Sequence, residues 1–302
     1  MSAVVATFFI LALLLGALWY GCHIQARKAA TSQTAPERDV TILTSPLSRP
    51  AIVVIKSIQV TKSYIGGAPP AVHSLTWPSR RGHPLSFIAC IDCSELPRND
   101  ELEWLPKDGL ILFFYDMIDQ PWGFDPKDRD GFATIYIPLS AEAASEVMSP
   151  PSGLPTEALI PKRFLKFLLT KLPPSWETSE ITQMRLSTQE MDTFMEKRSA
   201  IYGDEPHHQI GGYPDPIQNP EMDEECQLVT NGLYCGDETG YKDSRAKELR
   251  NGARDWSLLF QMDSDNELKV MWGDSGMIYF WIRRDDARAL KFDNTWVIQQ
   301  CG

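Results

Sequence analysis

The stretch that decides the fold is "HHQIGGYPDPIQ" (residues 207–218), because its centre, "IGGYP" (210–214), has an earlier counterpart in "IGGAP" (65–69). Adjacent glycines permit the left-handed backbone conformation that tight turns often require. A turn of the same kind at two distant places indicates that the segments around the turns share a local structure.

The segments that follow each turn extend the likeness. In the first copy they are "PLSFIACID" (84–92), "GLILFFYD" (109–116) and Phe132; in the second they are "SLLFQMDSD" (257–265), "GMIYFWIR" (276–283) and Phe292. Their density of β-branched and aromatic residues predicts strands. The second copy also carries an insertion, residues 217–255, whose composition predicts a long solvated loop.

These patterns predict an α+β fold, with a β-rich body built from two internally similar halves in one domain. We expect the domain to span residues 51–302, with halves at about 51–138 and 207–301 and a helical connection at about 139–206. Each half offers few strands and would leave an apolar face uncovered on its own. The halves are therefore expected to share one core.

One helix is predicted within the connection. Ser187 and Glu190 have the spacing of a capping box. The apolar side chains that follow fall on one face, which we expect to pack on a sheet: Met191, Phe194, Met195 and Ile201. Residues 163–174 fit either a short helix or a strand.

An apolar segment near the N-terminus predicts a membrane anchor. Residues 3–22 contain no charge, and twenty helical residues span about 30 Å. A cleaved signal peptide is the alternative, but no Lys or Arg precedes the segment, and bulky residues precede Cys22 where a lipoprotein cleavage site needs small ones. Arg27 and Lys28 follow the segment, which places the C-terminal body in the cytoplasm. We therefore predict a transmembrane helix within residues 1–23 and a flexible tether at 24–50.

Composition narrows the classes of partner. Forty acidic residues against 29 basic ones give a net charge of −11, and no basic cluster is interleaved with aromatic residues, so nucleic acid is not expected as a partner. The five cysteines outside the apolar segment are an odd number for a disulfide framework. Reduced thiols are expected.

The ordered motifs resemble the YwqG-like family, a bacterial domain of unknown function. The resemblance rests on "IGGAPP", "WPSRRGHPLSFIACIDCSELP" and "LPKDGLILFFYD", and later on "HHQIGGYPDPIQ", "LLFQMDSD", "WGDSGMIYFWI" and "VIQQC". It covers roughly residues 50–301 and implies a mixed α and β fold built on a β-sheet, with no established activity or catalytic residues. This chain departs from the family pattern in its N-terminal apolar segment and at Cys90, where the family more often has Gln, as the second copy does at Gln261.

The glycine pairs are the first candidate site. Gly66 and Gly67, and again Gly211 and Gly212, can direct backbone N–H groups into an anion-binding concavity. The alternative is a tight turn packed closely against the sheet, which is favoured because the Lys and Ser/Thr of a phosphate loop are missing.

Two histidines and several carboxylates form the second candidate. His207 and His208 precede the second glycine pair, and with Asp263 and Asp274 they are placed at the mouth of a cleft between the halves. Adjacent histidines on an extended chain point in opposite directions, which argues against a shared metal. Asp263, Asp265, Glu267 and Asp274 match positions one, three, five and twelve of a calcium loop, but Leu268 stands where that loop needs Gly.

The remaining motifs are weaker. Cys90 and Cys93 have redox spacing, but Cys90 lies in a strand pattern instead of at a helix N-terminus. No nucleophile elbow or dinucleotide fingerprint is present. Three tryptophans beside Pro or Gly are candidates for a rigid binding surface: Trp77, Trp122 and Trp272.

Together these observations predict a membrane-anchored cytoplasmic binding or protein-interaction module, held by residues 3–22, with no cofactor and an unknown ligand. The alternative is a small-ligand or metal-binding protein, or a hydrolase-type enzyme, that uses the cleft between the halves. Catalytic activity is not assigned.

Overall fold

The computed structural model describes residues 38–72, 75–138 and 146–302, and residues 40–302 form one compact unit. The predicted anchor lies outside the described residues. Within the described residues, every helix is too short or too polar to cross a bilayer. The body begins at Val40, earlier than the predicted boundary at residue 51, because a short helix, α2 (Val40–Thr44), buries Val40 against Ile181 and Phe194.

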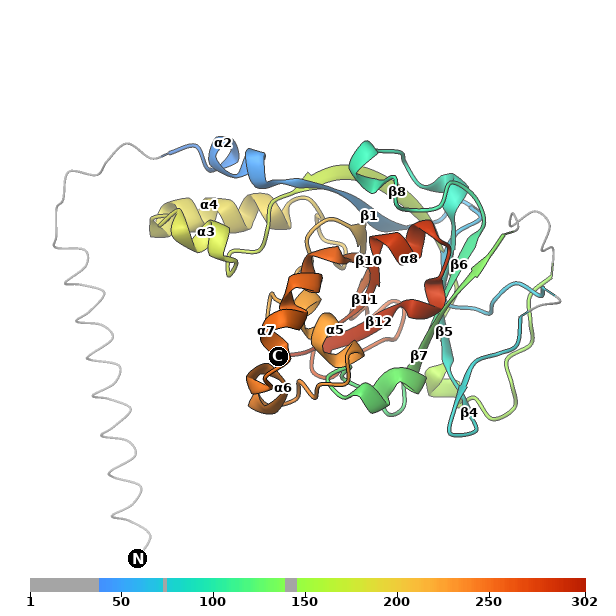
Figure 1. Cartoon of the computed structure of the whole chain (residues 1–302). Coiled ribbons are helices and arrows are strands. Elements are labelled where there is room, and N and C mark those ends of the chain that lie inside the picture. Colours follow the sequence, from blue (N-terminus) through green and yellow to red (C-terminus); the bar gives the residue numbers. More distant parts are fainter. Residues whose placement is uncertain (1–37, 73–74, 139–145) are drawn as a thin grey trace, which may run out of the picture. The chain divides into compact units, whose positions relative to one another are not determined.

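The centre of the body is a ten-stranded antiparallel sheet with the order β12-β11-β10-β9-β1-β8-β2-β5-β6-β7 (Figure 1). Its strands are β1 (Arg49–Ser57), β2 (Tyr64–Ile65), β5 (Ser86–Asp92), β6 (Leu110–Tyr115), β7 (Phe132–Ile137), β8 (Arg163–Leu172), β9 (Gln209–Gly211), β10 (Trp256–Asp263), β11 (Met277–Arg283) and β12 (Trp296–Gln300). A separate hairpin pairs β3 (Ser79–Arg80) with β4 (His83–Pro84). Residues 163–172, for which a short helix and a strand were both open, are therefore a strand within the connection.

The two halves of the sheet lie on either side of the β1–β8 pair, which runs from Arg49 opposite Leu172 to Ser57 opposite Phe164. The group β2-β5-β6-β7 continues from β8, and the group β9-β10-β11-β12 continues from β1. The strands are paired in equivalent registers in the two groups. Asp92 and Asp263 end equivalent strands, and each follows by four residues a bulge, at Ile88 and Leu259 respectively.

Two expectations about the second half were wrong. Phe292 lies in a 3-10 helix, η8 (Phe292–Asn294), and the strand equivalent to β7 begins at Trp296. The insertion is helical: its elements are α5 (Met222–Thr230), α6 (Glu238–Lys242), α7 (Ala246–Leu249) and η7 (Arg250–Asp255). Met222, Cys226 and Leu228 are buried there, and α5 packs against β10 and β12.

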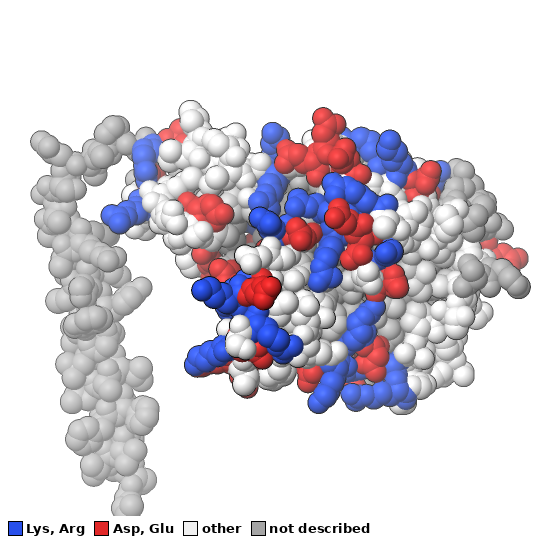
Figure 2. Space-filling model, viewed as in Figure 1, with Lys and Arg blue, Asp and Glu red and all other residues white. Residues whose placement is uncertain are grey.

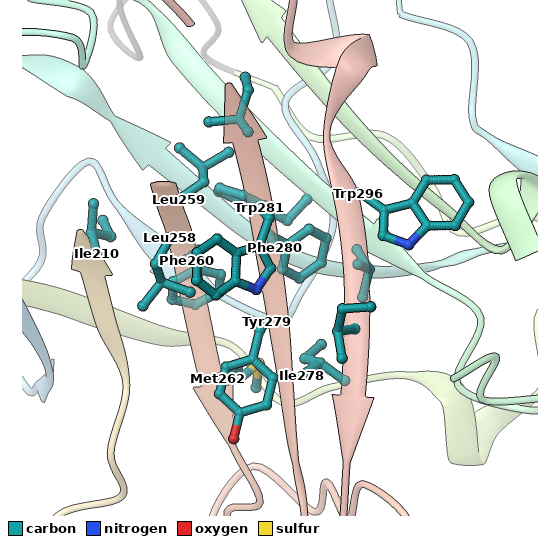
Figure 3. Close-up of a cluster of buried hydrophobic side chains, with 14 of the residues drawn as sticks. Ile210, Leu258, Leu259, Phe260, Met262, Ile278, Tyr279, Phe280, Trp281 and Trp296 are labelled. Atoms are coloured by element: carbon teal, nitrogen blue, oxygen red, sulfur yellow. The ribbon is translucent and has the colours of Figure 1, made fainter. Parts of the chain in front are cut away.

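The sheet curls until its two ends share one core. The Phe113 ring of β6 lies 5.0 Å from the rings of both Phe260 and Phe280. Figure 3 shows the latter two among the apolar side chains of β10 and β11. Tyr115 Oη also donates a hydrogen bond to Gln299 Oε1 at 2.6 Å, which joins β6 to β12.

The helices of the connection pack against α2, which precedes β1. They are α3 (Ser179–Gln183) and α4 (Thr188–Ser199), and the capping box of Ser187 and Glu190 is confirmed. Phe194 is buried against α2 and α3, and not on a sheet as predicted, while Met195 is 42 % exposed. The remaining elements are α8 (Arg284–Arg288) and the 3-10 helices η1 (Ser45–Leu47), η2 (Cys93–Glu95), η3 (Asp100–Leu102), η4 (Pro126–Gly131) and η6 (Thr156–Ala158).

The glycine turns are closed in the same way in both halves. Tyr64 Oη donates to the carbonyl of Ala68 at 2.9 Å, and Gln209 Nε2 donates to the carbonyl of Tyr213 at 2.6 Å. Gly66 has a φ of +68°, and a Cβ there would lie 2.5 Å from the carbonyl oxygens of Ile160 and Pro161. This turn requires glycine because of both its backbone conformation and its close neighbour.

The helical insertion buries a carboxyl group. Glu225 Oε1 accepts hydrogen bonds from Asn219 and Tyr241, whereas Oε2 is buried and has no partner in the part of the chain that the structure describes. Burial raises the pKa of Glu225 to about 7, despite the hydrogen bonds that favour its charged form. The folded state therefore holds this proton more tightly than the unfolded state does.

Replacing Gly66 tests whether its turn is packed as described. Gly66→Ala should reduce the free energy of unfolding by about 3 kcal/mol, from the left-handed backbone and the clash together. Gly203→Ala is the matched control, because Gly203 has a similar φ of +66° with open space around it, and it should cost only about 1 kcal/mol. Chemical unfolding of the purified full-length chain measures both. Equal losses would contradict the close packing.

Glu225 should make stability depend on pH. Its contribution is fully present below about pH 4.5 and is lost as the pH rises through about 7, a change of roughly 3 kcal/mol in the free energy of unfolding. Glu225→Gln should remove this component, so that the variant is the more stable protein at pH 8. The exposed Glu248→Gln should keep the wild-type profile. Parallel profiles for wild type and Glu225→Gln, from unfolding curves between pH 5 and 8, would exclude the raised pKa.

Candidate functional site

The structure brings three of the predicted site residues together before β9. The backbone N–H of His207 donates to Asp263 Oδ2 at 3.0 Å, and the N–H of Asp263 donates to His208 Nδ1 at 3.1 Å. Asp274 does not join them: it is exposed on the β10–β11 loop, where its carbonyl accepts from the N–H of Gly302.

His208 has a structural role. It is 1 % exposed. In the first half Ser63 takes the equivalent position: its Oγ accepts a hydrogen bond from the N–H of Asp92 at 2.9 Å, as His208 Nδ1 does from the N–H of Asp263. Since Nδ1 of His208 accepts a hydrogen bond, its proton is on Nε2, which faces Asp265 Oδ2 at 3.4 Å. This imidazole is buried away from substrates.

The calcium-like loop is held by an ammonium group. Lys56 Nζ lies 2.7 Å from Asp265 Oδ2 and 2.9 Å from Glu267 Oε2. Burial would raise the pKa of Asp265, but hydrogen bonds from His208 and Lys56 hold it well below its usual range. The described residues contain no group of three or more His, Cys, Asp or Glu side chains arranged to hold a metal ion.

His207 belongs to a second polar cluster. Its Nδ1 is hydrogen-bonded to Asp215 Oδ2, and its ring stacks on Tyr202 with centroids 4.0 Å apart. Arg198 from the end of α4 donates to Asp215 Oδ1 at 3.3 Å and to the carbonyls of Pro173 and Pro214. Burial would raise the pKa of Asp215, but His207 and Arg198 lower it. Sequence reasoning missed both Arg198 and Tyr202. A basic residue in the last turn of a helix, such as Arg198, is usually explained by the helix dipole alone.

The glycine pairs do not form one shared site. The N–H groups of Gly66 and Gly67 donate to the carbonyls of Ile88 and Ile160, so they are not free to bind an anion. Gly211 lies in β9, where a Cβ would meet the side chain of Leu102 at 2.7 Å. Only Gly212, of the eight candidate residues, lines the clefts described next.

Two adjacent clefts, named here the Gly212 groove, share Arg49, Gly212 and Ser257 as lining residues. One, of about 340 Å³, lies between the β5–β6 loop of the first half, at residues 100–104, and β10 with α8 of the second half. The other, of about 290 Å³, lies between the start of α3, residues 212–214 and the start of α5. A cleft between the halves therefore exists, but His207, His208, Asp263 and Asp274 do not line it.

The smaller cleft of the Gly212 groove is acidic. Four carboxylates line it, and within the described residues none of them forms an ion pair: Glu177, Glu180, Glu221 and Asp223. Burial raises the pKa of Glu177 and Asp223, and backbone N–H groups offset only part of this effect at Asp223.

Three aromatic residues also line the smaller cleft: Tyr213, Trp256 and Trp281. Arg49 lies over the Tyr213 ring at 4.2 Å, and Trp256 and Trp281 line the cleft from β10 and β11. Trp281 is 5 % exposed, and its Nε1–H has no hydrogen-bond acceptor among the described residues. This combination of carboxylates and aromatic rings suits an organic cation.

The cysteines and tryptophans that the sequence singled out are mostly buried. The five described cysteines are free and buried, and burial raises the pKa of the Cys90 and Cys93 thiols, which disfavours the reactive thiolate. Trp272 is fully buried, so its prediction as a surface contact was wrong. Trp77 packs on Phe114, whereas Trp122 is 42 % exposed.

Charge is mixed on the face of the body shown in Figure 2, where Lys and Arg alternate with Asp and Glu. No continuous basic surface is seen on that face.

Removing Lys56 should show that its ammonium group is structural. Lys56→Met leaves Asp265 buried without its closest cation and should reduce the free energy of unfolding by about 3 kcal/mol. Lys166→Met, an exposed change on the neighbouring strand β8, should cost less than about 0.5 kcal/mol. Chemical unfolding at pH 7 measures both, and similar small losses would mean that the Lys56 pairs contribute little.

Comparison with known proteins identifies the family and not an activity. Curated proteins give no match to this chain. The family model described as "Domain of unknown function (DUF1963)" matches residues 63–301, which extend from just before β2 to just after β12. The chain therefore belongs to the DUF1963 family.

Proposed function

We propose that this protein is a membrane-anchored binding module whose body faces the cytoplasm and presents the Gly212 groove to a protein partner. The observation that carries the proposal is a set of four carboxylates, none in an ion pair within the described residues, in a groove formed by both halves of the body. Carboxyl groups whose pKa is raised by burial, as those of Glu177 and Asp223 are, are commonly found where a ligand binds.

The contacts of the side chains suited to acid–base catalysis favour a binding role over an enzymatic one. His208 and Asp263 are held by each other and by neighbouring backbone groups, and His207 is engaged by Asp215 and Tyr202. None of the three lines the Gly212 groove. Side chains that are held by such contacts and lie outside the groove stabilise the fold without contacting a substrate.

We infer that the two halves arose by duplication and that the YwqG-like resemblance and DUF1963 describe the same family. The support for duplication is the shared strand order, the equivalent bulges at Ile88 and Leu259, and the equivalent contacts of Ser63 and His208. The support for the family is that the quoted motifs fall within residues 63–301.

A small-molecule ligand is the second candidate function. It is favoured by the size of the smaller cleft, about 290 Å³, which is near the lower end of known ligand pockets, and by the unpaired Nε1–H of Trp281. A rise in melting temperature with one member of a panel of amines, nucleotides and metal ions would favour this candidate. A flat panel together with one protein cross-linked reproducibly to the groove favours the module.

The anchor is tested by deleting residues 2–23. The full-length chain should stay with membranes after an alkaline carbonate wash, because twenty uncharged residues cross the bilayer, and the deletion should move it to the soluble fraction. A C-terminal green fluorescent protein should be fluorescent and a C-terminal alkaline phosphatase inactive, since the body faces the cytoplasm. Retention of the deletion variant in membranes, or the opposite reporter pattern, would reject the anchor or its orientation.

A further inference from the structure

We propose that the Gly212 groove binds a basic segment of a partner protein, with a Lys or Arg side chain inserted among Glu177, Glu180, Glu221 and Asp223. This inference rests on the proposed binding function and names the chemistry of the partner. It goes beyond that function because it assigns the smaller cleft to a cationic side chain.

The first argument is a comparison of acidic clusters within the body. Arg80 is buried among Asp116, Asp119, Asp128 and Asp130, at 3.0 to 3.6 Å from each. Lys56 lies in the same way among Asp265, Glu267 and Glu205.

The smaller cleft has as many carboxylates as the Arg80 cluster but, within the described residues, no cation paired with them. Arg49, its one basic lining residue, lies over the Tyr213 ring. Among these three clusters this one has no cation paired with its carboxylates within the described residues, and a ligand would supply one.

The second argument is the chemistry of the cleft wall. Aromatic faces attract ammonium and guanidinium groups, and the protein already uses this contact twice nearby, with Arg49 over Tyr213 and Arg283 over Trp256 at 4.2 Å each. The Nε1–H of Trp281 lacks an acceptor, and a backbone carbonyl of a bound segment is a suitable one. A cationic side chain on a peptide backbone would therefore supply a charge for the carboxylates and an acceptor for this N–H, beside rings that already pack against Arg49 and Arg283.

The third argument concerns the length of the ligand. The two clefts share Arg49, Gly212 and Ser257, so an extended chain can pass from one to the other. The larger cleft contains both signs of charge: Asp100, Glu101 and Glu103 with Arg284 and Arg288. A single amine fills only the smaller cleft, whereas a polypeptide at about 3.3 Å per residue can use both. The net charge of −11 also steers a basic partner toward the body.

The experiment measures binding of a fluorescein-labelled nine-residue peptide, with four Lys or Arg residues separated by Ser, to the full-length chain in nanodiscs. Glu177→Gln/Asp223→Asn should weaken binding at least tenfold. Asp192→Asn/Glu196→Gln is the matched control, because it removes two charges from the exposed face of α4, and it should weaken binding less than twofold. A Glu-containing version of the peptide should not bind.

A second variant protects the test against misfolding. If Glu177→Gln/Asp223→Asn lowers the melting temperature, Glu180→Gln/Glu221→Gln replaces it, since both of these side chains are exposed, and it should show the same loss of affinity. Competition by spermidine or lysinamide at the concentration of peptide that gives half-saturation would overturn the proposal in favour of a small amine.

Equal weakening by the groove and control variants would also overturn it, because the binding would then follow net charge alone. Absence of peptide binding rejects the basic segment. If a partner still cross-links reproducibly to the body in that case, the proposed binding function stands without this inference.

Discussion

The pairing of β1 with β8 is the interaction on which the rest of the structure depends. Nine consecutive residues of each strand are opposite one another, and each strand carries one half of the sheet on its other edge. Neither half could bury its inner face alone, because a few short strands leave apolar side chains in water. The central pair therefore turns two incomplete sheets into one, and the curl of that sheet brings Phe113 against Phe260 and Phe280.

The two halves keep equivalent backbone positions but fill them with different side chains. Ser63 and His208 accept the same backbone hydrogen bond, and Tyr64 and Gln209 close the same turn. A third pair of equivalent residues is Cys90 and Gln261. Cys90 lies opposite Tyr64 in the sheet, whereas the side chain of Gln261 donates to the carbonyl of His207 and accepts from the N–H of Asp215. The second half thus carries more polar contacts around its turn, and these contacts order the 207–215 segment beside the groove.

The sequence predicts the strands and turns well because their signals are local. The runs around Phe113 and Phe280, the two glycine turns and the capping box of Ser187 depend on neighbouring residues, which propensity and periodicity describe. The helical insertion was missed because its apolar residues are sparse and gain their burial from contact with distant strands, as Met222 does. Trp272 was misplaced for the same reason: it lies beside Gly273 on a loop, but the loop folds inward and packs the indole on Tyr115.

The candidate site was predictable only in part, since its position depends on which segments distant in the sequence come together in the fold. Gly212 was identified from the repeat, but Glu177, Glu221 and Asp223 come from segments with no sequence signal of a shared site. They meet because α3 follows β8 and α5 follows the second glycine turn, so that both elements lie beside the start of β10. The first half has no equivalent insertion after its turn. The asymmetry between the halves therefore places this acidic cleft beside the second turn, and the sheet formed by the two halves positions the segments that line it.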